Sequence, residues 1–353
     1  MSDLSPSSPR LTSLSHGGGC GCKISPGVLS ALLAKSNLTA SLPFPDLLVG
    51  TETADDAAVY RINDHQAIVA TTDFFMPIVD DPHDFGRIAA TNAISDIYAM
   101  GATPLMALAI VGMPINVLPH EVIGQILAGG QSICREAGIP LAGGHSIDSV
   151  EPIYGLVAIG IVDPNNLKRN ASAQPGDLLI LGKPLGVGIY SAALKKEKLS
   201  PEHYQQMIAA TTTLNRPGID LAQLPQVHAL TDVTGFGLLG HTLEVAKGAG
   251  LTARLDADAI PFLPDVQTLA KAGYITGASA RNWAAYGEHI ALPAGADPSL
   301  QALLTDPQTA GGLLTACAPD VKDAVLAAFA RHGFDQAAVI GRLEAGLAQV
   351  IVE

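Results

Sequence analysis

The sequence predicts a two-domain α/β protein with a glycine-rich arm ahead of its first domain. The chain has 353 residues, and domains usually contain about 100–200 residues. Predicted strands and helices alternate along most of it, and a polar, turn-rich stretch at 164–175 divides the alternating part. We therefore expect a flexible arm at 1–50, an N-terminal domain at 51–165 and a C-terminal domain at 170–353.

The first domain is predicted from apolar segments that alternate in type. Strands are expected at 67–72, 105–111 and 155–162, and helices at 85–100 and 121–137. Gly101 and Gly138 follow the two helices, where glycine favours the end of a helix. The uncharged stretch Ile97–His120 is long enough to span a bilayer, but its three prolines favour a helix end, a buried strand and a turn.

The second domain repeats this alternation. Strands are expected at 177–181, 229–233, 251–255, 312–316 and 337–342, and helices at 189–198, 201–214, 238–247 and 321–331. In the arm, Ser25 and Pro26 are typical of a helix start, and the helix would run toward Lys35.

Composition excludes several classes of protein. The net charge is 20 − 33 = −13, whereas proteins that bind nucleic acid depend on basic side chains, so nucleic acid is not expected as the main partner. The first ten residues lack an apolar core typical of a signal peptide. Four cysteines in a chain of this length do not make a disulfide framework. We expect a cytoplasmic protein with no membrane partner, in which Cys134 and Cys317 are core thiols.

Acidic residues dominate the window 51–150, which contains twelve acids, three arginines and no lysine. Asp73 is expected to end the strand at 67–72, and Asp232 ends a strand of the second domain in the same way. The acids concerned are Asp55, Asp56, Asp73, Asp96 and Asp232. Mg²⁺ prefers carboxylate and phosphate oxygens, so we predict that metal ions on these acids hold a nucleotide. Each acid taken alone is also typical of a turn or a helix cap.

Two glycine patterns resemble nucleotide-binding motifs. The segment 176–184 has the wrong spacing for a phosphate loop and Pro184 in place of its hydroxyl residue. A GxGxxG pattern is formed by Gly235, Gly237 and Gly240 between a predicted strand and helix, and this supports a dinucleotide-binding oxidoreductase as the alternative function. Asp232, just before it, would repel a pyrophosphate.

The glycine-rich run 16–23 (HGGGCGCK) is the most specific feature of the arm. Lys23 is expected to lower the pKa of Cys20 and make it a nucleophile, and the glycines would let the run move and approach a ligand closely. A zinc site formed with His16 and Cys22, a redox-sensing cysteine pair, and a selenium or zinc carrier without enzymatic activity remain alternatives.

A second glycine cluster lies at 142–146, where Gly143 and Gly144 precede His145 and Ser146. Its backbone N–H groups and two polar side chains could serve a binding site. From the residues alone, however, a tight turn is the favoured interpretation.

Seven segments together resemble selenophosphate synthetase (selenide, water dikinase). They are His16–Lys23, Thr53–Tyr60, Thr71–Val79, Arg87–Asp96, Leu141–Asp148, Thr231–His241 and Asp306–Gly312, in that order along the chain. The resemblance covers the chain from about residue 11 to its end. It implies the fold of aminoimidazole ribonucleotide synthetase, with mixed sheets flanked by helices. It also implies a homodimer that pairs N-terminal sheets.

The resemblance further implies a reaction in which ATP, selenide and water give selenophosphate, AMP and phosphate, with Mg²⁺ required and K⁺ as activator. Cys20, often selenocysteine in this family, and Lys23 match the catalytic positions. Asp56, Asp96 and Asp232 match the Mg²⁺ ligands. The ATP-contacting positions correspond to Lys23, Thr53, Ala54, Asp55, Asp73, Asp96, Gly144, His145 and Ser146. The selenium could arrive as free selenide or on a selenium-delivery protein.

Overall fold

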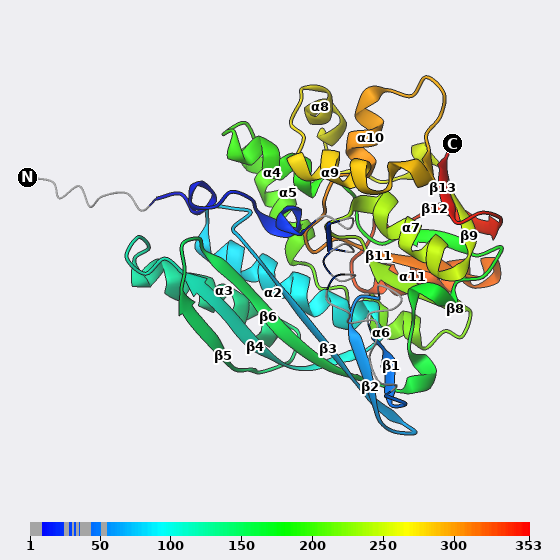
Figure 1. Cartoon of the computed structure of the whole chain (residues 1–353), viewed down its shortest axis with the longest axis horizontal. Helices are drawn as coiled ribbons and strands as arrows, with labels where there is room; N and C mark the ends of the chain where they lie inside the picture. The colour runs from blue at the N-terminus through cyan, green and yellow to red at the C-terminus, as the bar shows by residue number, and fades with distance from the viewer. Residues whose placement is uncertain (1–8, 25–27, 30–31, 33–34, 36–43, 51–54) are drawn as a thin grey trace, which may run out of the picture.

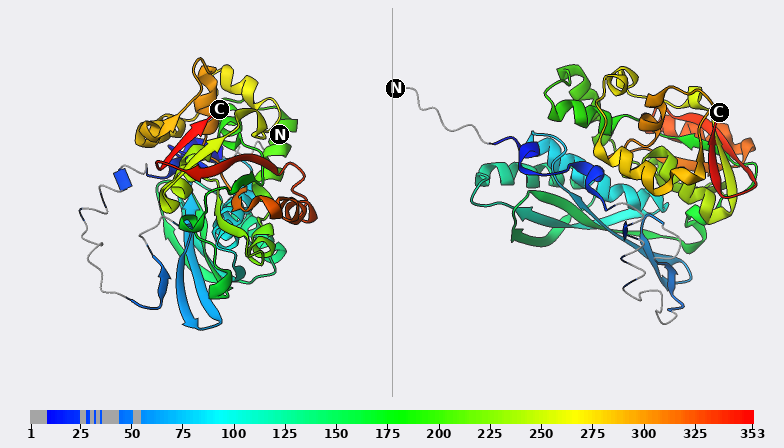
Figure 2. Two further views of the ribbon diagram at one scale, coloured as in Figure 1. Left: turned by 90° about the vertical axis from the view of Figure 1, so that its right-hand side faces the viewer. Right: turned by 45° about the horizontal axis from the view of Figure 1, so that its top comes forward.

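Two mixed sheets organise the chain in the computed structural model, which describes residues 9–24, 28–29, 32, 35, 44–50 and 55–353. The first sheet has the strand order β1-β2-β3-β6-β4-β5, and the second has the order β10-β13-β9-β12-β7-β11-β8. The two sheets lie at opposite ends of the molecule, with helices between them (Figures 1 and 2). The predicted α/β class with mixed sheets and flanking helices is confirmed.

The six-stranded sheet comes from the first half of the chain. Its strands are β1 (Leu47–Val49), β2 (Ala58–Asn63), β3 (Gln66–Phe75), β4 (Thr103–Met113), β5 (Leu141–Asp148) and β6 (Ile153–Val162). Only the β4–β5 pair is parallel; the other pairs are antiparallel. Helices α2 (Pro82–Ala99) and α3 (His120–Glu136) cover one face of this sheet (Figure 1).

Helix α2 is the central element that carries part of the site. It begins where Asp81 accepts a hydrogen bond from the Asp84 amide, with Pro82 in its first turn. Gly101, with φ of +72°, follows its end. Most of its residues are buried because it packs against the first sheet on one side and C-terminal elements on the other. This double burial fixes the polar residues of α2 between the two halves.

The seven-stranded sheet comes from the second half. Its strands are β7 (Leu178–Leu181), β8 (Val227–Asp232), β9 (Leu251–Leu255), β10 (Ile290–Ala291), β11 (Leu313–Cys317), β12 (Ala338–Ala345) and β13 (Gln349–Val352). The helices of this half are α4 (Val187–Lys195), α5 (Pro201–Thr212), α6 (Pro217–Ala222), α7 (Gly237–Ala249), α8 (Val266–Lys271), α9 (Gly277–Tyr286), α10 (Pro298–Leu304) and α11 (Lys322–Arg331). The described part of the arm contains the short 3₁₀ helices η1 (Leu11–Leu14) and η2 (Gly19–Cys22), and β1 of the first sheet lies at its end.

Most predicted elements are confirmed within a few residues, and Cys134 and Cys317 are buried free thiols as expected. The uncharged stretch 97–120 divides into the end of α2, strand β4 and the start of α3. Among the described residues, we find no helix with the length and apolarity to cross a membrane. The expected helix from Ser25 to Lys35 falls largely outside the described residues.

Two sequence-based interpretations are wrong. The cluster 142–146 is not a tight turn but lies within β5, because it pairs in parallel with β4. Asp73 does not end its strand, because β3 continues to Phe75 in a ladder with β6. Both errors arise from sheet pairing, which joins segments distant in sequence and extends strands beyond their local signals.

Two glycines allow α2 and α3 to cross closely. A Cβ on Gly86 of α2 would overlap the Ile126 carbonyl of α3, and a Cβ on Gly129 of α3 would overlap the His83 carbonyl of α2. We expect Gly129→Ala to lower the free energy of unfolding by about 1–3 kcal/mol, since the helices would have to separate. Urea unfolding followed by circular dichroism measures this change.

Gly124→Ala is the matched control, because Gly124 lies on the same helix and its Cβ would meet no atom within 4 Å. It should leave stability unchanged or raise it by up to about 1 kcal/mol, as alanine favours a helix interior. Equal effects of the two substitutions would contradict the close crossing.

Candidate active site

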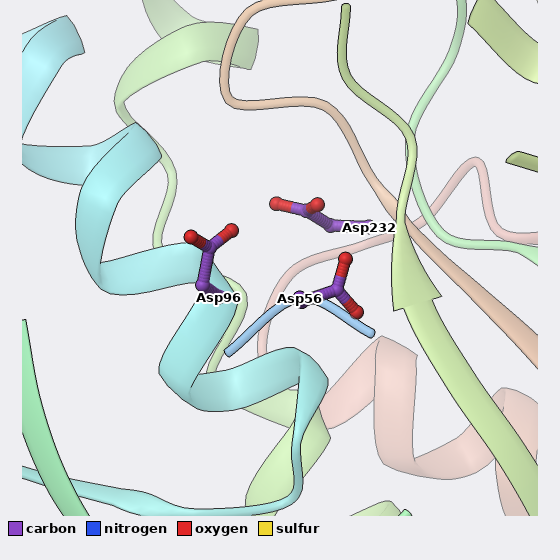
Figure 3. A group of neighbouring side chains, drawn as sticks. All are labelled: Asp56, Asp96 and Asp232. Carbon is purple, nitrogen blue, oxygen red and sulfur yellow. The ribbon is translucent and has the colours of Figure 1, made fainter. Parts of the chain in front are cut away.

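Three aspartates from distant parts of the chain meet between the two sheets. Asp56 precedes β2, Asp96 lies in the last turns of α2, and Asp232 is the final residue of β8. One carboxylate oxygen of each lies within 4.8 Å of the others, and the side chains face a common space (Figure 3). The sequence-based prediction that these three acids form a group is therefore consistent with their placement.

Hydroxyl groups hold each carboxylate in place. Thr71 Oγ1 donates to Asp96 Oδ2 at 2.5 Å, Ser95 Oγ donates to Asp232 Oδ2 at 2.5 Å, and Thr231 Oγ1 donates to Asp56 Oδ1 at 2.9 Å. These donors are neutral, so they orient the acids without cancelling their charge. Asp56 Oδ2 is buried and has no hydrogen-bond partner among the described residues.

The electrostatics of this aspartate cluster are unfavourable without a cation. Burial raises the pKa of Asp56 and Asp96 well above the usual range, and the neighbouring Asp232 carboxylate raises both further. Burial also raises the pKa of Asp232, although the Ser95 hydrogen bond opposes this. A divalent cation removes this repulsion, and carboxylate oxygens are ligands that Mg²⁺ prefers. The donor set and the unpartnered Asp56 oxygen thus fit a hard metal ion.

The glycine-rich run docks beside the aspartate cluster through its backbone. The Gly19 amide donates to the Met76 carbonyl at 2.9 Å, and the Cys20 amide donates to Thr309 Oγ1 at 3.0 Å. Gly19 has a φ of +54°, and a Cβ there would overlap Thr309 Oγ1. Only glycine allows both this conformation and this approach.

Docking buries the Cys20 side chain, which is 1% exposed. Its Sγ donates to Asn92 Oδ1 at 3.1 Å. Lys23 Nζ lies 3.1 Å from Asp73 Oδ2 and so pairs with a carboxylate rather than with the thiol. Burial opposes the charge on Lys23, but the carboxylates of Asp73 and Asp96 raise its pKa well above the usual range. Lys23 is therefore a cation in this arrangement.

The expectation that Lys23 lowers the pKa of Cys20 is wrong for the docked run. Burial raises the pKa of the Cys20 thiol well above its usual range, and the opposing effect of Lys23 does not overcome it. The physical reason is that desolvation of a thiolate costs more than one partly shared cation returns. The docked Cys20 is a protonated thiol.

Asn92 of α2 connects these groups and was not assigned a role from the sequence. Its Oδ1 accepts from the Cys20 thiol and from the Ala310 amide at 2.7 Å, and its Nδ2 donates to Asp73 Oδ2 at 2.8 Å. With both ends of the amide used, its orientation is fixed. The available sequence signal was its position one helical turn before Asp96, which puts both residues on one face of α2.

The GxGxxG pattern has a different role from the one a dinucleotide site requires. A Cβ on Gly235 would lie 2.9 Å from the Cys20 carbonyl oxygen and 3.2 Å from the Lys23 side chain. The backbone near the first glycine is thus covered by the glycine-rich run. Asp232 of the cluster lies three residues before Gly235, where its charge would repel a pyrophosphate. The oxidoreductase alternative is not supported.

The remaining predicted ATP-contacting positions are dispersed. Asp55 Oδ1 accepts from the Asn170 amide at 2.8 Å, whereas Thr53 and Ala54 lie outside the described residues. Gly144, His145 and Ser146 are exposed on β5, the edge strand that β6 and β4 separate from β3. With about 4.8 Å between neighbouring strands, the structure does not bring these three residues to the aspartate cluster of the same chain.

The outer face of the six-stranded sheet, opposite α2 and α3, is apolar and exposed. Large side chains on it include Tyr60, Ile62, Ile68, Phe74 and Ile147, each between 37% and 57% exposed. Along β2 and β3 these exposed residues alternate with buried ones. A continuous apolar face of this kind is typical of a protein–protein interface.

Comparison with known proteins gives a consistent family. The model of the AIR synthase related protein N-terminal domain matches residues 54–162, and that of the C-terminal domain matches residues 174–352. A protein of Pseudomonas straminea named selenide, water dikinase is 73% identical over 344 residues, covering 98% of this chain and 96% of the relative. A Rhizobium meliloti protein with the same name is 59% identical and covers 98% of each chain.

Solved structures share the fold at low sequence identity. A complex described as AaThiL with AMPPCP and TMP aligns with a TM-score of 0.65 at 18% identity, covering 93% of each chain. Hydrogenase maturation protein HypE in complex with ATP aligns with a TM-score of 0.61 at 19% identity, covering 98% of this chain and 94% of the other. The resemblance seen in the sequence is thus confirmed: the chain belongs to the selenide, water dikinase family, within the AIR synthase related proteins.

Proposed function

We propose that this chain synthesises selenophosphate from ATP, selenide and water, releasing AMP and phosphate. One observation carries the proposal: a cluster of three aspartates fitted to a divalent cation lies next to a docked cysteine–lysine pair. The relatives that share up to 73% of its residues over nearly its full length are named for this use of selenide and water. The comparison and the site geometry support the same chemistry.

Asp56, Asp96 and Asp232 are proposed to hold Mg²⁺. When bound, Mg²⁺ would neutralise phosphate charge, which is the main requirement of phosphoryl transfer. The chain's contribution is to fix the acids through the hydroxyls of Thr71, Ser95 and Thr231. Residues 51–150 contain three arginines and no lysine. The phosphates of ATP would therefore be bound mainly by the metal that the acids hold.

The glycine-rich run is proposed to supply Cys20 and Lys23 as catalytic residues. Lys23, held as a cation by Asp73, would stabilise negative charge on the transferring phosphoryl group. Docking of the run removes Cys20 from water, which protects a reactive selenium substrate and strengthens local electrostatics. Asn92 would position the Cys20 thiol beside the phosphoryl acceptor site.

ATP is proposed to contact two copies of the chain. Asp96 belongs to the aspartate cluster, and Lys23, Asp55 and Asp73 lie near it. The resemblance adds Thr53 and Ala54, whereas Gly144, His145 and Ser146 lie on an edge strand away from the cluster. A homodimer through the apolar outer face of the first sheet would bring a partner's edge strand to the site. K⁺ activation, a cytoplasmic location and a selenium-delivery protein remain predictions from the sequence.

The raised pKa values predict how Mg²⁺ binding depends on pH. The folded pKa values of the three aspartates exceed the unfolded value of about 3.9, so the metal-free protein loses stability as pH rises through the folded values. Mg²⁺ competes with these protons. We therefore expect the stabilisation by Mg²⁺, measured by urea unfolding with and without chelator, to increase from about pH 5 to pH 8.

Asp232→Asn should reduce this stabilisation and abolish Mg²⁺-dependent ATP consumption. Asp323→Asn is the control, because Asp323 has the same charge but is 91% exposed on α11. It should behave as wild type. A Mg²⁺ effect that is independent of pH, or unchanged in Asp232→Asn, would exclude the proposed ligands.

Phosphorus NMR under anaerobic conditions tests the reaction itself. With ATP, selenide and Mg²⁺, the wild-type protein should form selenophosphate and AMP. Lys23→Gln should slow this by about 10²–10³-fold, since it removes one cation from the transition state, and Cys20→Ala should also lose activity.

Cys22→Ser is the matched control, because Cys22 belongs to the same glycine-rich run but is not among the residues proposed to act on substrate. It should retain activity. Release of ADP alone, or stoichiometric selenium binding without ATP turnover, would refute the proposed function.

The proposed dimer is tested by one substitution on the apolar outer face. Phe74→Glu would place a charge there and should convert the dimer to a monomer in sedimentation equilibrium, with weaker ATP binding as a consequence. Leu347→Glu, at a site that is 77% exposed in the second half of the chain, should remain dimeric. A dimer that persists in Phe74→Glu would contradict this interface.

A further inference from the structure

A cavity of about 490 Å³ lies against the glycine-rich run. The run forms one wall through Gly17, Gly18 and Gly21, and residues of α4 and α9 form the opposite walls. None of the three clustered aspartates lines it. Its size is within the range of small-molecule sites, and it is a space separate from the proposed metal site.

The charge of this cavity is opposite to that of the chain. Lys195, Lys196 and Arg281 line it, and its described lining contains no aspartate or glutamate, although the chain has a net charge of −13. None of these three cations forms an ion pair within the described part of the chain. Arg281 instead donates to the Gly21 carbonyl at 2.9 Å, and Lys196 Nζ lies 5.3 Å from the centre of the Tyr274 ring. Three unneutralised cations around one hollow favour an anionic ligand.

The start of α9 adds to this positive character. Thr276 caps the helix by accepting from the Ser279 amide, and Thr276, Gly277 and Ala278 all line the cavity. The first amides of a helix have no acceptor within the helix, and its N-terminus carries a partial positive charge. A small anion in the cavity would thus meet side-chain cations and backbone donors together.

The cavity also adjoins the reactive cysteine. Thr309 lines it and accepts the hydrogen bond from the Cys20 amide, and Gly21, the next residue of the run, also lines it. In-line phosphoryl transfer requires the attacking group to approach from the side opposite the leaving group. Cys20 and Lys23 contact Asn92 and Asp73, whereas Gly17, Gly18 and Gly21 line the cavity. The cavity therefore offers the second substrate an approach to the run that differs from that of the metal-bound phosphate.

We propose that this cavity binds the small anionic selenium substrate, which is the hydroselenide ion (HSe⁻) at neutral pH, before it reaches Cys20. The inference rests on the proposed function and adds a substrate site to it. Because the run forms one wall, the complete cavity exists only when the run is docked, so an anion bound there stabilises the docked state by linkage. Inorganic phosphate, a product of the proposed reaction, is also a small anion and is therefore the alternative ligand for this cavity.

The test compares steady-state kinetics of a double variant, Lys195→Gln with Lys196→Gln, with those of wild type. The KM for hydrogen selenide should rise about tenfold, as expected for the loss of about 1.4 kcal/mol of binding. The KM for ATP and kcat at saturating selenide should not change. Lys198→Gln is the matched control, because Lys198 follows the same helix and is not part of the cavity lining, and it should leave every constant unchanged.

Two outcomes overturn the assignment. If selenide KM is unchanged while product inhibition by inorganic phosphate weakens, the cavity holds the product. If neither changes, it holds no small anion of the reaction.

Calorimetric titration of ATP-free protein with hydrogen sulfide, the lighter analogue, tests the cavity without turnover. Weaker binding in the double variant than in Lys198→Gln supports the cavity even if selenophosphate is never formed. Equal binding in the two variants refutes it.

Discussion

Repulsion among three partly or fully buried carboxylates is the constraint on which this structure depends. Asp56, Asp96 and Asp232 come from a loop, a helix and a strand end, and folding places their oxygens within 4.8 Å. No basic side chain forms an ion pair with them among the described residues. The surrounding packing has to hold like charges together, and the burial of α2 between two sheets provides the rigidity. Either protons or a bound cation relieves this repulsion, and the raised pKa values of the three acids reflect the first of these.

The glycine-rich run separates two regions of opposite charge. On one side are the aspartate cluster and Asp73, which holds Lys23 as a cation. On the other is a cavity lined by lysine and arginine side chains. Within the run, the Lys23 side chain pairs with Asp73, whereas the Gly21 carbonyl accepts a hydrogen bond from Arg281 at the cavity. A phosphate donor bound through metal and a small anionic acceptor would then approach Cys20 from different sides.

The sequence was informative where a residue's local neighbours decide its role. The strand-end position of Asp232 and an acid-rich metal site were predicted from the residues, and the family resemblance selected Asp56, Asp96 and Asp232 among the acids. The state of Cys20 was not, because the effect of Lys23 on its pKa depends on burial and on competition from Asp73, both of which come from distant segments. The role of Asn92 could not be predicted for the same reason, because its partners Cys20, Asp73 and Ala310 are far apart in the chain.

The amino-acid sequence alone determined the class of fold and the family, since periodicity and motif spacing are local properties, and the family resemblance then predicted which acids would hold a metal. Tertiary structure decided what those residues do together. Residues 142–146 lie on an exposed edge strand rather than in a turn, because they pair with β4. The glycine-rich run covers the first glycine of the GxGxxG pattern, and burial keeps the Cys20 thiol protonated. Each of these outcomes depends on burial or pairing between distant segments, and desolvation energy exists only once the chain has folded around a group.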